Sequence, residues 1–111
     1  MGNNEKKREQ IFKNGVEYLE KGQLQDAIDA FEQVIEGDDK DAAAHFNLGV
    51  ACMRMVRTDV DKDELYEEKT DEEAWILRAI SEFNKVLELE PNNEDAKRNI
   101  KTLNELLNLG I

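Results

Sequence analysis

The fold is set by IFKNGVEY at residues 11–18 and by AIDAF at residues 27–31. The chain carries this pattern a second time, as HFNLGVAC at residues 45–52 and AISEF at residues 79–83. Both copies place a glycine at the fifth position of the first run, and these two glycines are 34 residues apart. Both copies begin the second run with alanine and end it with phenylalanine. The chain therefore contains an internal repeat with two elements in each unit.

The first copy is predicted to form two helices, because its apolar residues recur at helical spacing. The first helix runs from about Glu5 to Lys21 and the second from about Leu24 to Glu36. Gly22 lies between them and suits a left-handed conformation that ends the first helix. Since no strand pattern appears in the sequence, we expect an all-α protein.

Three further helices are predicted. The third starts near Asp41, the fourth runs from about Asp71 to Glu90, and the fifth runs from about Glu94 to Leu109. Pro91 stops the fourth helix, and Asn93 is placed to cap the fifth. The predicted elements are thus two helical pairs and a final helix.

The second copy contains an insertion. Ala27 comes nine positions after Tyr18 in copy one, and Ala79 comes 27 positions after Cys52 in copy two. We expect the additional residues to lengthen the helices by a turn or more and to leave a long acidic loop near residues 58–69. Thr70-x-x-Glu73 has the spacing of a capping box, which predicts an early start for the fourth helix.

These features resemble the tetratricopeptide repeat (TPR), a helix–turn–helix unit that stacks into arrays. The resemblance implies an α-solenoid of five helices in a right-handed superhelical stack, with one domain over residues 1–111. Repeat one would cover about residues 8–41, and repeat two about residues 42–93 with an inserted segment at about 54–73. A capping helix at about 94–109 would cover the last repeat.

The small residues of the motif have a physical role in this family, because they let neighbouring helices approach closely. The sequence offers glycine and alanine for that purpose at Gly15, Gly49, Ala27 and Ala79. Large residues then fill the surrounding space, at Tyr18, Phe31 and Phe83, and Cys52 takes the place of Tyr18 in the second repeat. His45 and Asn14 depart from the family pattern, which usually has large apolar residues there.

Composition excludes several partner classes. Acidic residues outnumber basic ones by 26 to 15, for a formal net charge of −11. Electrostatic repulsion makes nucleic acid and anionic membrane surfaces poor partners. A single cysteine permits no intrachain disulfide, and no apolar run is long enough for a membrane span or a signal peptide. We expect a cytoplasmic protein.

The first helix of each TPR pair lines a concave groove, and the resemblance carries this role over to specific residues. The expected partner-binding residues are Phe12, Val16, Leu19, Phe46, Asn47, Val50, Met53, Arg98 and Lys101. Most of them are apolar, which favours an amphipathic helix or an apolar peptide as ligand. The alternatives are that these residues pack the first helix against the third, or that a second copy covers them.

One TPR subclass grips the terminal carboxylate of chaperones such as Hsp70 and Hsp90. That clamp needs a lysine and an asparagine on the first helix, where this chain has Phe12 and Val16. Asn47 matches the clamp asparagine of the second repeat. Without the cation the site cannot offset the desolvation of a carboxylate, so we expect no binding of an EEVD-type terminus.

Signals for metals and catalysis are weak. Asp59-x-Asp61-x-Asp63 has the opening spacing of a calcium loop, but Glu64 stands where the loop needs glycine. His45 and Cys52 share a helix face without a second histidine or cysteine to complete a zinc site. The chain also lacks a glycine-rich phosphate loop and a GxSxG motif. We expect no metal, no cofactor and no enzymatic activity.

The sequence therefore predicts a protein–protein interaction module, a scaffold or adaptor that binds a peptide or helix of a partner protein in an apolar groove. The alternative is a structural module that self-associates into a homodimer through the same surface or through the lengthened helices.

Overall fold

The computed structural model describes residues 2–62 and 69–109, with side chains described for residues 4–56 and 72–109. Five helices make up almost all of the described chain, and no strand occurs within it. They are α1 (Gly2–Glu20), α2 (Leu24–Gly37), α3 (Ala42–Lys62), α4 (Lys69–Leu89) and α5 (Glu94–Asn108). The all-α prediction is confirmed.

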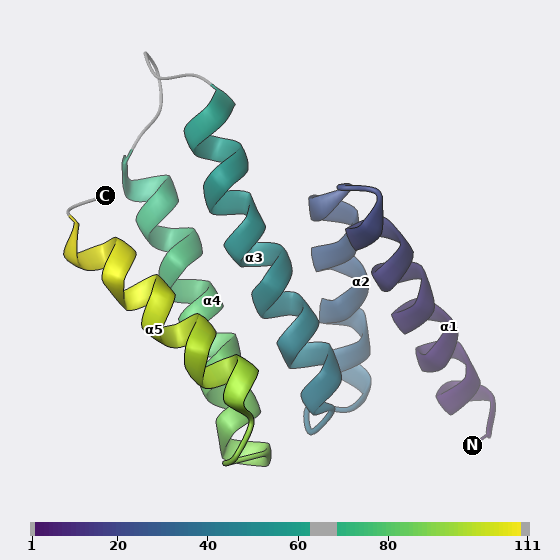
Figure 1. Ribbon diagram of the computed structural model, residues 1–111. Helices are drawn as coiled ribbons and strands as arrows, with labels where there is room; N and C mark the ends of the chain where they lie inside the picture. Colours follow the sequence, from purple (N-terminus) through teal and green to yellow (C-terminus); the bar gives the residue numbers. More distant parts are fainter. Residues whose placement is uncertain (1, 63–68, 110–111) are drawn as a thin grey trace.

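The helices form two hairpins and a final helix that stack side by side (Figure 1). Each helix packs mainly on its neighbours in the chain, with the most extensive contact between α3 and α4. In Figure 1, α1, α3 and α5 lie toward the viewer, and α2 and α4 lie behind them. The first helices of successive units therefore share one face of the stack, as expected for helical hairpin repeats.

Both hairpins close on the same contact between a glycine and an aromatic ring. A Cβ atom added at Gly15 of α1 would lie 2.8 Å from the ring of Phe31 of α2. A Cβ added at Gly49 of α3 would lie 2.9 Å from the ring of Phe83 of α4. Because real Cβ atoms do not approach so closely, only glycine lets each ring lie against the helix backbone. The close approach predicted from the repeat is thus made by the phenylalanine of the same hairpin.

One apolar core runs through the whole stack. It contains Phe31 and Phe83 together with Ala27 and Ala79, and all four are fully buried. Leu48 and Cys52 of α3, Ile76 of α4, and Ala96 and Leu103 of α5 extend the same cluster. The final helix is therefore packed as the structural cover of the second hairpin. None of the helices, over the described residues, is long and apolar enough to cross a membrane.

Local sequence signals explain where the helices begin and end. Gly22 has φ of 77°, the left-handed conformation that ends α1. The Asp41 carboxylate accepts a hydrogen bond from the backbone N–H of Ala44 at 3.0 Å, at the start of α3. Asn93 accepts the equivalent bond from Ala96 at 2.9 Å, at the start of α5. The Asn93 cap was predicted and is confirmed. The matching Asp41 cap shows that α3 and α5 begin in the same way.

The inserted segment departs from the prediction of a long loop. Residues 58–62 continue α3, and α4 already begins at Lys69, so only residues 63–68 lie outside the described elements. Thr70 lies within α4 and does not precede it, so the predicted capping position is wrong. Asp59 and Asp61 lie on helical backbone, which also contradicts a calcium loop at that place. The insertion lengthens both helices of one hairpin, because α3 and α4 each span 21 residues.

Cys52 belongs to the core and not to a reactive site. Its side chain is 0% exposed, and burial raises the pKa of its thiol from 9.0 to about 12, an effect that nearby Arg78 partly opposes. The thiol thus stays protonated in the folded protein at any physiological pH, which makes it a weak nucleophile and a weak metal ligand.

The contact between Gly15 and Phe31 can be tested by a double-mutant cycle. Gly15→Ala should destabilise the protein by up to about 2 kcal/mol, because overpacking against a buried ring exceeds the gain of about 1 kcal/mol in helix propensity. Phe31→Leu makes room for the methyl group, so the double variant should lose less stability than the sum of the single variants. Denaturant unfolding measures all three. A Gly15→Ala protein more stable than wild type would contradict the contact.

The raised thiol pKa predicts a pH-dependent stability difference between wild type and Cys52→Ala. The folded thiol keeps its proton between its unfolded pKa of 9.0 and its folded pKa of about 12, so wild type loses stability as pH rises through that window. From pH 8 to pH 10, wild type should lose about 1.4 kcal/mol more than Cys52→Ala in its free energy of unfolding. Parallel losses in urea titrations at the two pH values would contradict this.

Candidate peptide-binding groove

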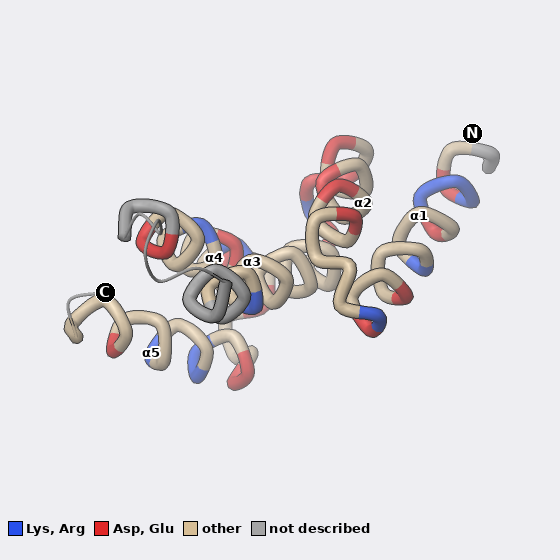
Figure 2. Tube along the Cα trace, turned by 90° about the horizontal axis from the view of Figure 1, so that it is seen from above, with Lys and Arg blue, Asp and Glu red and all other residues tan. Residues whose placement is uncertain are grey.

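The concave face of the stack is formed by α1, α3 and α5. Seen from above in Figure 2, α5 and the C-terminal end of α1 lie on the same side of the stack, and the N-terminal end of α1 slants back toward the side of α2. The hairpin geometry forces this arrangement, because α2 and α4 occupy the opposite layer. The helices predicted to line a groove are thus the ones opposite the layer of α2 and α4.

On α1, the structure separates the three predicted residues. Phe12 and Val16 are half-buried and pack against the edge of the core. The Phe12 ring meets the Phe31 ring edge-on, with centroids 5.5 Å apart and planes at 71°. Leu19 is only 7% exposed and belongs to the core itself, so it is not available to a ligand. Phe12 and Val16 remain the candidates of this helix.

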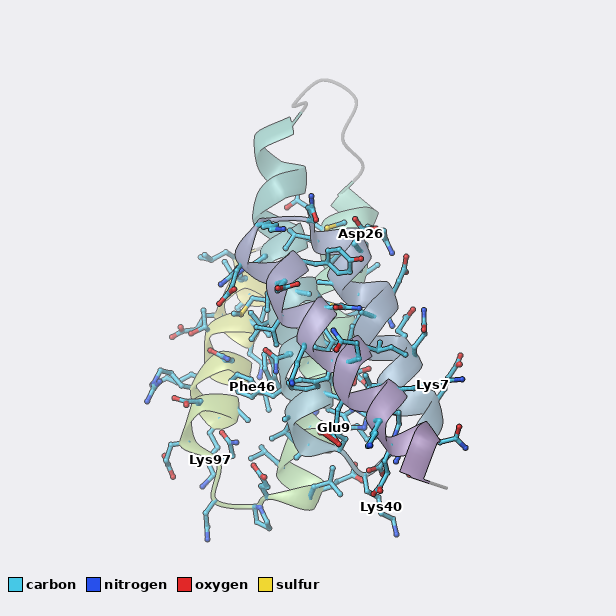
Figure 3. The ribbon with its side chains drawn as sticks, turned by 90° about the vertical axis from the view of Figure 1, so that its right-hand side faces the viewer. Lys7, Glu9, Asp26, Lys40, Phe46 and Lys97 are labelled. Atoms are coloured by element: carbon cyan, nitrogen blue, oxygen red, sulfur yellow. The ribbon has the colours of Figure 1, made fainter. Side chains whose placement is uncertain are left out.

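On α3, all four predicted residues are half-buried. The Phe46 ring meets the Phe83 ring edge-on, with centroids 5.3 Å apart and planes at 68°. Val50 and Met53 pack against the same core. The amide of Asn47 donates a hydrogen bond of 2.9 Å to the backbone carbonyl of Ala43. In the side view of Figure 3, the Phe46 label falls between α5 and α1.

On α5, Arg98 and Lys101 are exposed. Arg98 Nη1 lies 2.8 Å from Asp95 Oδ1, one turn earlier on the same helix. Such exposed pairs contribute at most about 1 kcal/mol and rearrange readily. These two residues are thus accessible cations at the α5 side of the face.

Two hollows lie at the end of this face where α3 begins. The α1–α3 hollow has a volume of about 350 Å³. The α3–α5 hollow has a volume of about 270 Å³. Phe12 lines the first and Phe46 lines the second, and Ala43 lines both. The hollows are therefore neighbours along one groove, with an aromatic side chain in each.

Acidic residues of these hollows were not predicted as site residues. Glu9 of α1, Asp41 at the cap of α3, and Glu90 and Asp95 around the start of α5 all line them. In the sequence each stands among many other carboxylates on polar faces. Only the juxtaposition of three helix ends distinguishes them, and no spacing in the sequence encodes that juxtaposition.

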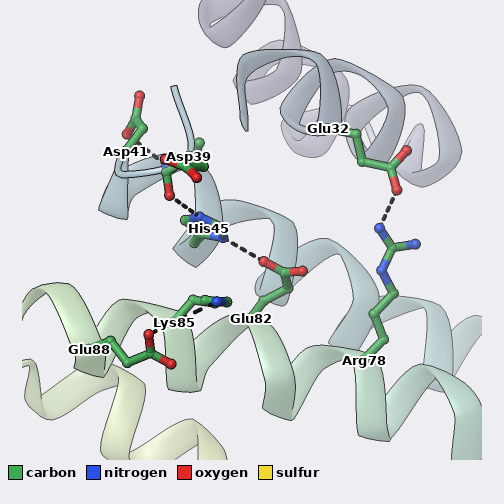
Figure 4. Close-up of polar contacts among 9 residues, drawn as sticks. Glu32, Asp39, Asp41, His45, Arg78, Glu82, Lys85 and Glu88 are labelled. Carbon is green, nitrogen blue, oxygen red and sulfur yellow. Dashed lines mark hydrogen bonds and ion pairs between the residues drawn. The ribbon is translucent and has the colours of Figure 1, made fainter. Parts of the chain in front are cut away.

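His45, considered above as a zinc ligand, is engaged within the protein. Its side chain is 5% exposed, with Nδ1 2.7 Å from Glu82 Oε1 and Nε2 2.9 Å from the backbone carbonyl oxygen of Asp39 (Figure 4). Both partners accept hydrogen bonds, so both contacts are satisfied when the ring carries two protons. His45 thereby ties the start of α3 to α4 and to the turn before α3.

Another polar contact links the two hairpins. Arg78 of α4 binds Glu32 of α2 (Figure 4). Burial lowers the pKa of Arg78, but the hydrogen bond to Glu32 and nearby negative charges outweigh it, and the net shift is upward. The guanidinium stays charged, so this contact is structural and offers no acid–base chemistry.

Comparison with known proteins locates the repeat in sequence. The family described as TPR repeat matches residues 15–56, which run from the Gly15 of α1 to the Val56 of α3. No curated protein matches the chain significantly.

Among solved structures, the first TPR of Spaghetti (RPAP3) bound to the HSP90 peptide SRMEEVD is similar to this chain. Its sequence identity is 21%, the match covers 92% of this chain and 96% of that one, and the TM-score is 0.44. The family match shows a TPR repeat over residues 15–56. The second hairpin closes on a glycine–phenylalanine contact equivalent to that of the first.

Proposed function

We propose that the protein is an interaction module whose groove, between α1 and α5 and floored by α3, binds an apolar segment of a partner protein. The observation that carries the proposal is the half-buried state of Phe12, Val16, Phe46, Val50 and Met53 on the concave face. Each of these side chains is anchored in the core on one side and accessible on the other. A ligand that covers them removes further apolar surface from water.

Preorganisation of the two aromatic residues supports this function. Phe12 and Phe46 are held edge-on by Phe31 and Phe83, which are fully buried. Aromatic side chains already fixed in place lose little conformational entropy when a ligand binds. Such residues, central and beside a hollow, are the usual anchors of a protein interface. We assign Phe12 and Phe46 as the anchors of the groove.

Homodimerisation through the same face is the second candidate. It would bury the same apolar side chains. The net charge of −11 opposes it, since two copies repel each other at close range. We therefore favour a partner of different composition.

We propose further that the groove does not take an EEVD-type chaperone terminus. Phe12 and Val16 occupy the positions where a carboxylate clamp needs polar groups on its first helix, and both pack against the core. The N-terminus of α3 is also closed to an anion, because the Asp41 carboxylate already accepts the Ala44 N–H. A ligand carboxylate there would meet like charge.

The groove can be tested by selecting twelve-residue peptides from a random display library against the wild-type protein. Selected peptides should contain apolar residues and should lose at least about tenfold in affinity for the Phe12→Glu/Val50→Glu variant, since each charge is placed on the binding surface. Leu77→Glu is the matched control, because Leu77 is 51% exposed on α4 in the opposite layer. Circular dichroism verifies that all variants are folded.

Two results would count against this function. Selected peptides could bind the groove variant as tightly as wild type, which would place the binding surface elsewhere. Light scattering could instead show a wild-type dimer that Phe12→Glu/Val50→Glu converts to a monomer, which would favour self-association.

The second proposal is tested with a fluorescent peptide of sequence SRMEEVD. Fluorescence anisotropy should show no saturable binding below about 100 μM, because the groove offers no cation at the positions of Phe12 and Val16. The same peptide with an amidated C-terminus is the control for charge-independent contacts. Saturable micromolar binding that amidation abolishes would refute the proposal.

A further inference from the structure

We infer that the partner segment is basic: the acidic end of the groove, made by the α1–α3 and α3–α5 hollows, takes lysine or arginine side chains that flank an apolar residue. This inference rests on the proposed function, because it concerns the same groove. It specifies the chemistry of the ligand, which the apolar floor alone leaves open.

The α1–α3 hollow combines an apolar wall with an acidic rim. Phe12 of α1 and Val34 of α2 provide apolar surface. Four carboxylates and two basic side chains also line it, namely Glu5, Glu9, Asp38 and Asp41, and Arg8 and Lys13. The carboxylates are therefore in excess. A long side chain with an apolar stem and a cationic head matches such a lining, because the stem packs on the phenylalanine while the head reaches the rim.

The α3–α5 hollow is acidic without a compensating cation among its lining residues. Phe46 provides its aromatic surface, and Glu90 and Asp95 are its charged residues. Asn47 and Asn93 add polar groups, each already holding an intramolecular hydrogen bond. A cation in this hollow meets the Glu90 carboxylate, which accepts a hydrogen bond from Asn93, and the Asp95 carboxylate, whose present partner is Arg98.

Continuity between the hollows sets the form of the ligand. Ala43 lines both, so a chain that crosses the small Ala43 side chain can place one residue in each hollow. Figure 3 labels Glu9 on α1, which lines the first hollow, and Phe46, which lines the second. A peptide with two basic residues around a central apolar residue fits this geometry.

The positive end of α3 does not cancel the negative field of the hollows. A helix N-terminus carries a partial positive charge that would disfavour a cation. Here the Asp41 carboxylate accepts the Ala44 N–H, and the Asp38 carboxylate accepts the Lys40 N–H at 3.1 Å. Arg98, the nearest predicted cation of α5, is paired with Asp95 and does not line either hollow. The net field at this end of the groove is negative, in line with the whole-chain charge of −11.

The experiment uses three fluorescent peptides with the sequence pattern X-L-X-X-L-X, in which X is lysine, glutamine or glutamate. We expect the lysine peptide to bind at least about tenfold more tightly than the glutamine peptide at low salt, and the glutamate peptide not to bind. The advantage of lysine over glutamine should shrink as sodium chloride rises from 20 to 300 mM, because salt screens the exposed charges over about a Debye length.

Variants then locate the charges. Glu9→Gln/Glu90→Gln removes one carboxylate from each hollow and should weaken binding of the lysine peptide by roughly three- to tenfold, with little effect on the glutamine peptide. Glu20→Gln/Glu73→Gln is the matched control, since it removes the same net charge from exposed positions near the C-terminal end of α1 and the N-terminal end of α4. The control should leave both affinities within about twofold of wild type.

The outcomes separate this inference from the proposed function. If the lysine and glutamine peptides bind equally well to wild type, and neither binds to Phe12→Glu/Val50→Glu, the inferred preference for a basic ligand is refuted and the proposed apolar groove is supported. Equal weakening by the two glutamine double variants would also overturn it, because net charge alone would then explain binding. If none of the three peptides binds at concentrations where a library-selected peptide does, only the preference for a basic ligand is refuted. If the library selection also yields no binding peptide, the proposed peptide-binding function of the groove is refuted as well.

Discussion

The contact between a glycine and the ring of a phenylalanine governs this structure. It occurs once in each hairpin, with Gly15 under Phe31 and Gly49 under Phe83, and in both places a single added methyl group would collide with a buried ring. The glycines therefore cost helix propensity in the middle of two helices in return for close packing. That exchange is favourable because a fully buried phenylalanine contributes a few kcal/mol of hydrophobic stabilisation, more than the roughly 1 kcal/mol lost at each glycine.

The groove depends on the same contact. The rings of Phe31 in α2 and Phe83 in α4 pack against Gly15 and Gly49. The same two rings make edge-on contacts with Phe12 and Phe46. Each hairpin thus has the same stack of three residues: a glycine, the buried phenylalanine that lies on it, and the half-buried phenylalanine that packs on the buried one. A change at either glycine that displaces the buried ring would displace the groove ring with it. The concave surface is therefore part of the core packing and cannot be altered independently of it.

The repeat pattern was enough to predict five helices, their order and the cap at Asn93, because each depends on residues close together in the chain. The insertion was predicted less well. Its acidic composition favoured a loop at residues 58–69, yet α3 runs to Lys62 and α4 starts at Lys69, because the additional residues can pair as antiparallel helix on helix. Leu19 was assigned to the groove from its position in the repeat, but it is buried as part of the core. The hollows depend on how the ends of α1, α3 and α5 meet, which no local pattern specifies.

The width of the groove is set by packing and not by the polar contacts between hairpins. The pair of Arg78 and Glu32 joins α4 to α2, but both side chains are more than a third exposed, so it contributes at most about 1 kcal/mol. The His45 contacts are buried, but they act within the second hairpin and at the turn that enters it. Arg54 of α3 adds one hydrogen bond of 3.2 Å to the Leu19 carbonyl oxygen of α1. The main contact between the hairpins is the packing of α2 on α3, and Phe31, Leu48 and Cys52 of these helices belong to one core cluster. Since α2 is part of the layer behind the groove, the angle at that interface fixes how far α1 stands from α5. The apolar core thus determines the shape of the proposed groove, while the carboxylates that line the two hollows set the charge at its end.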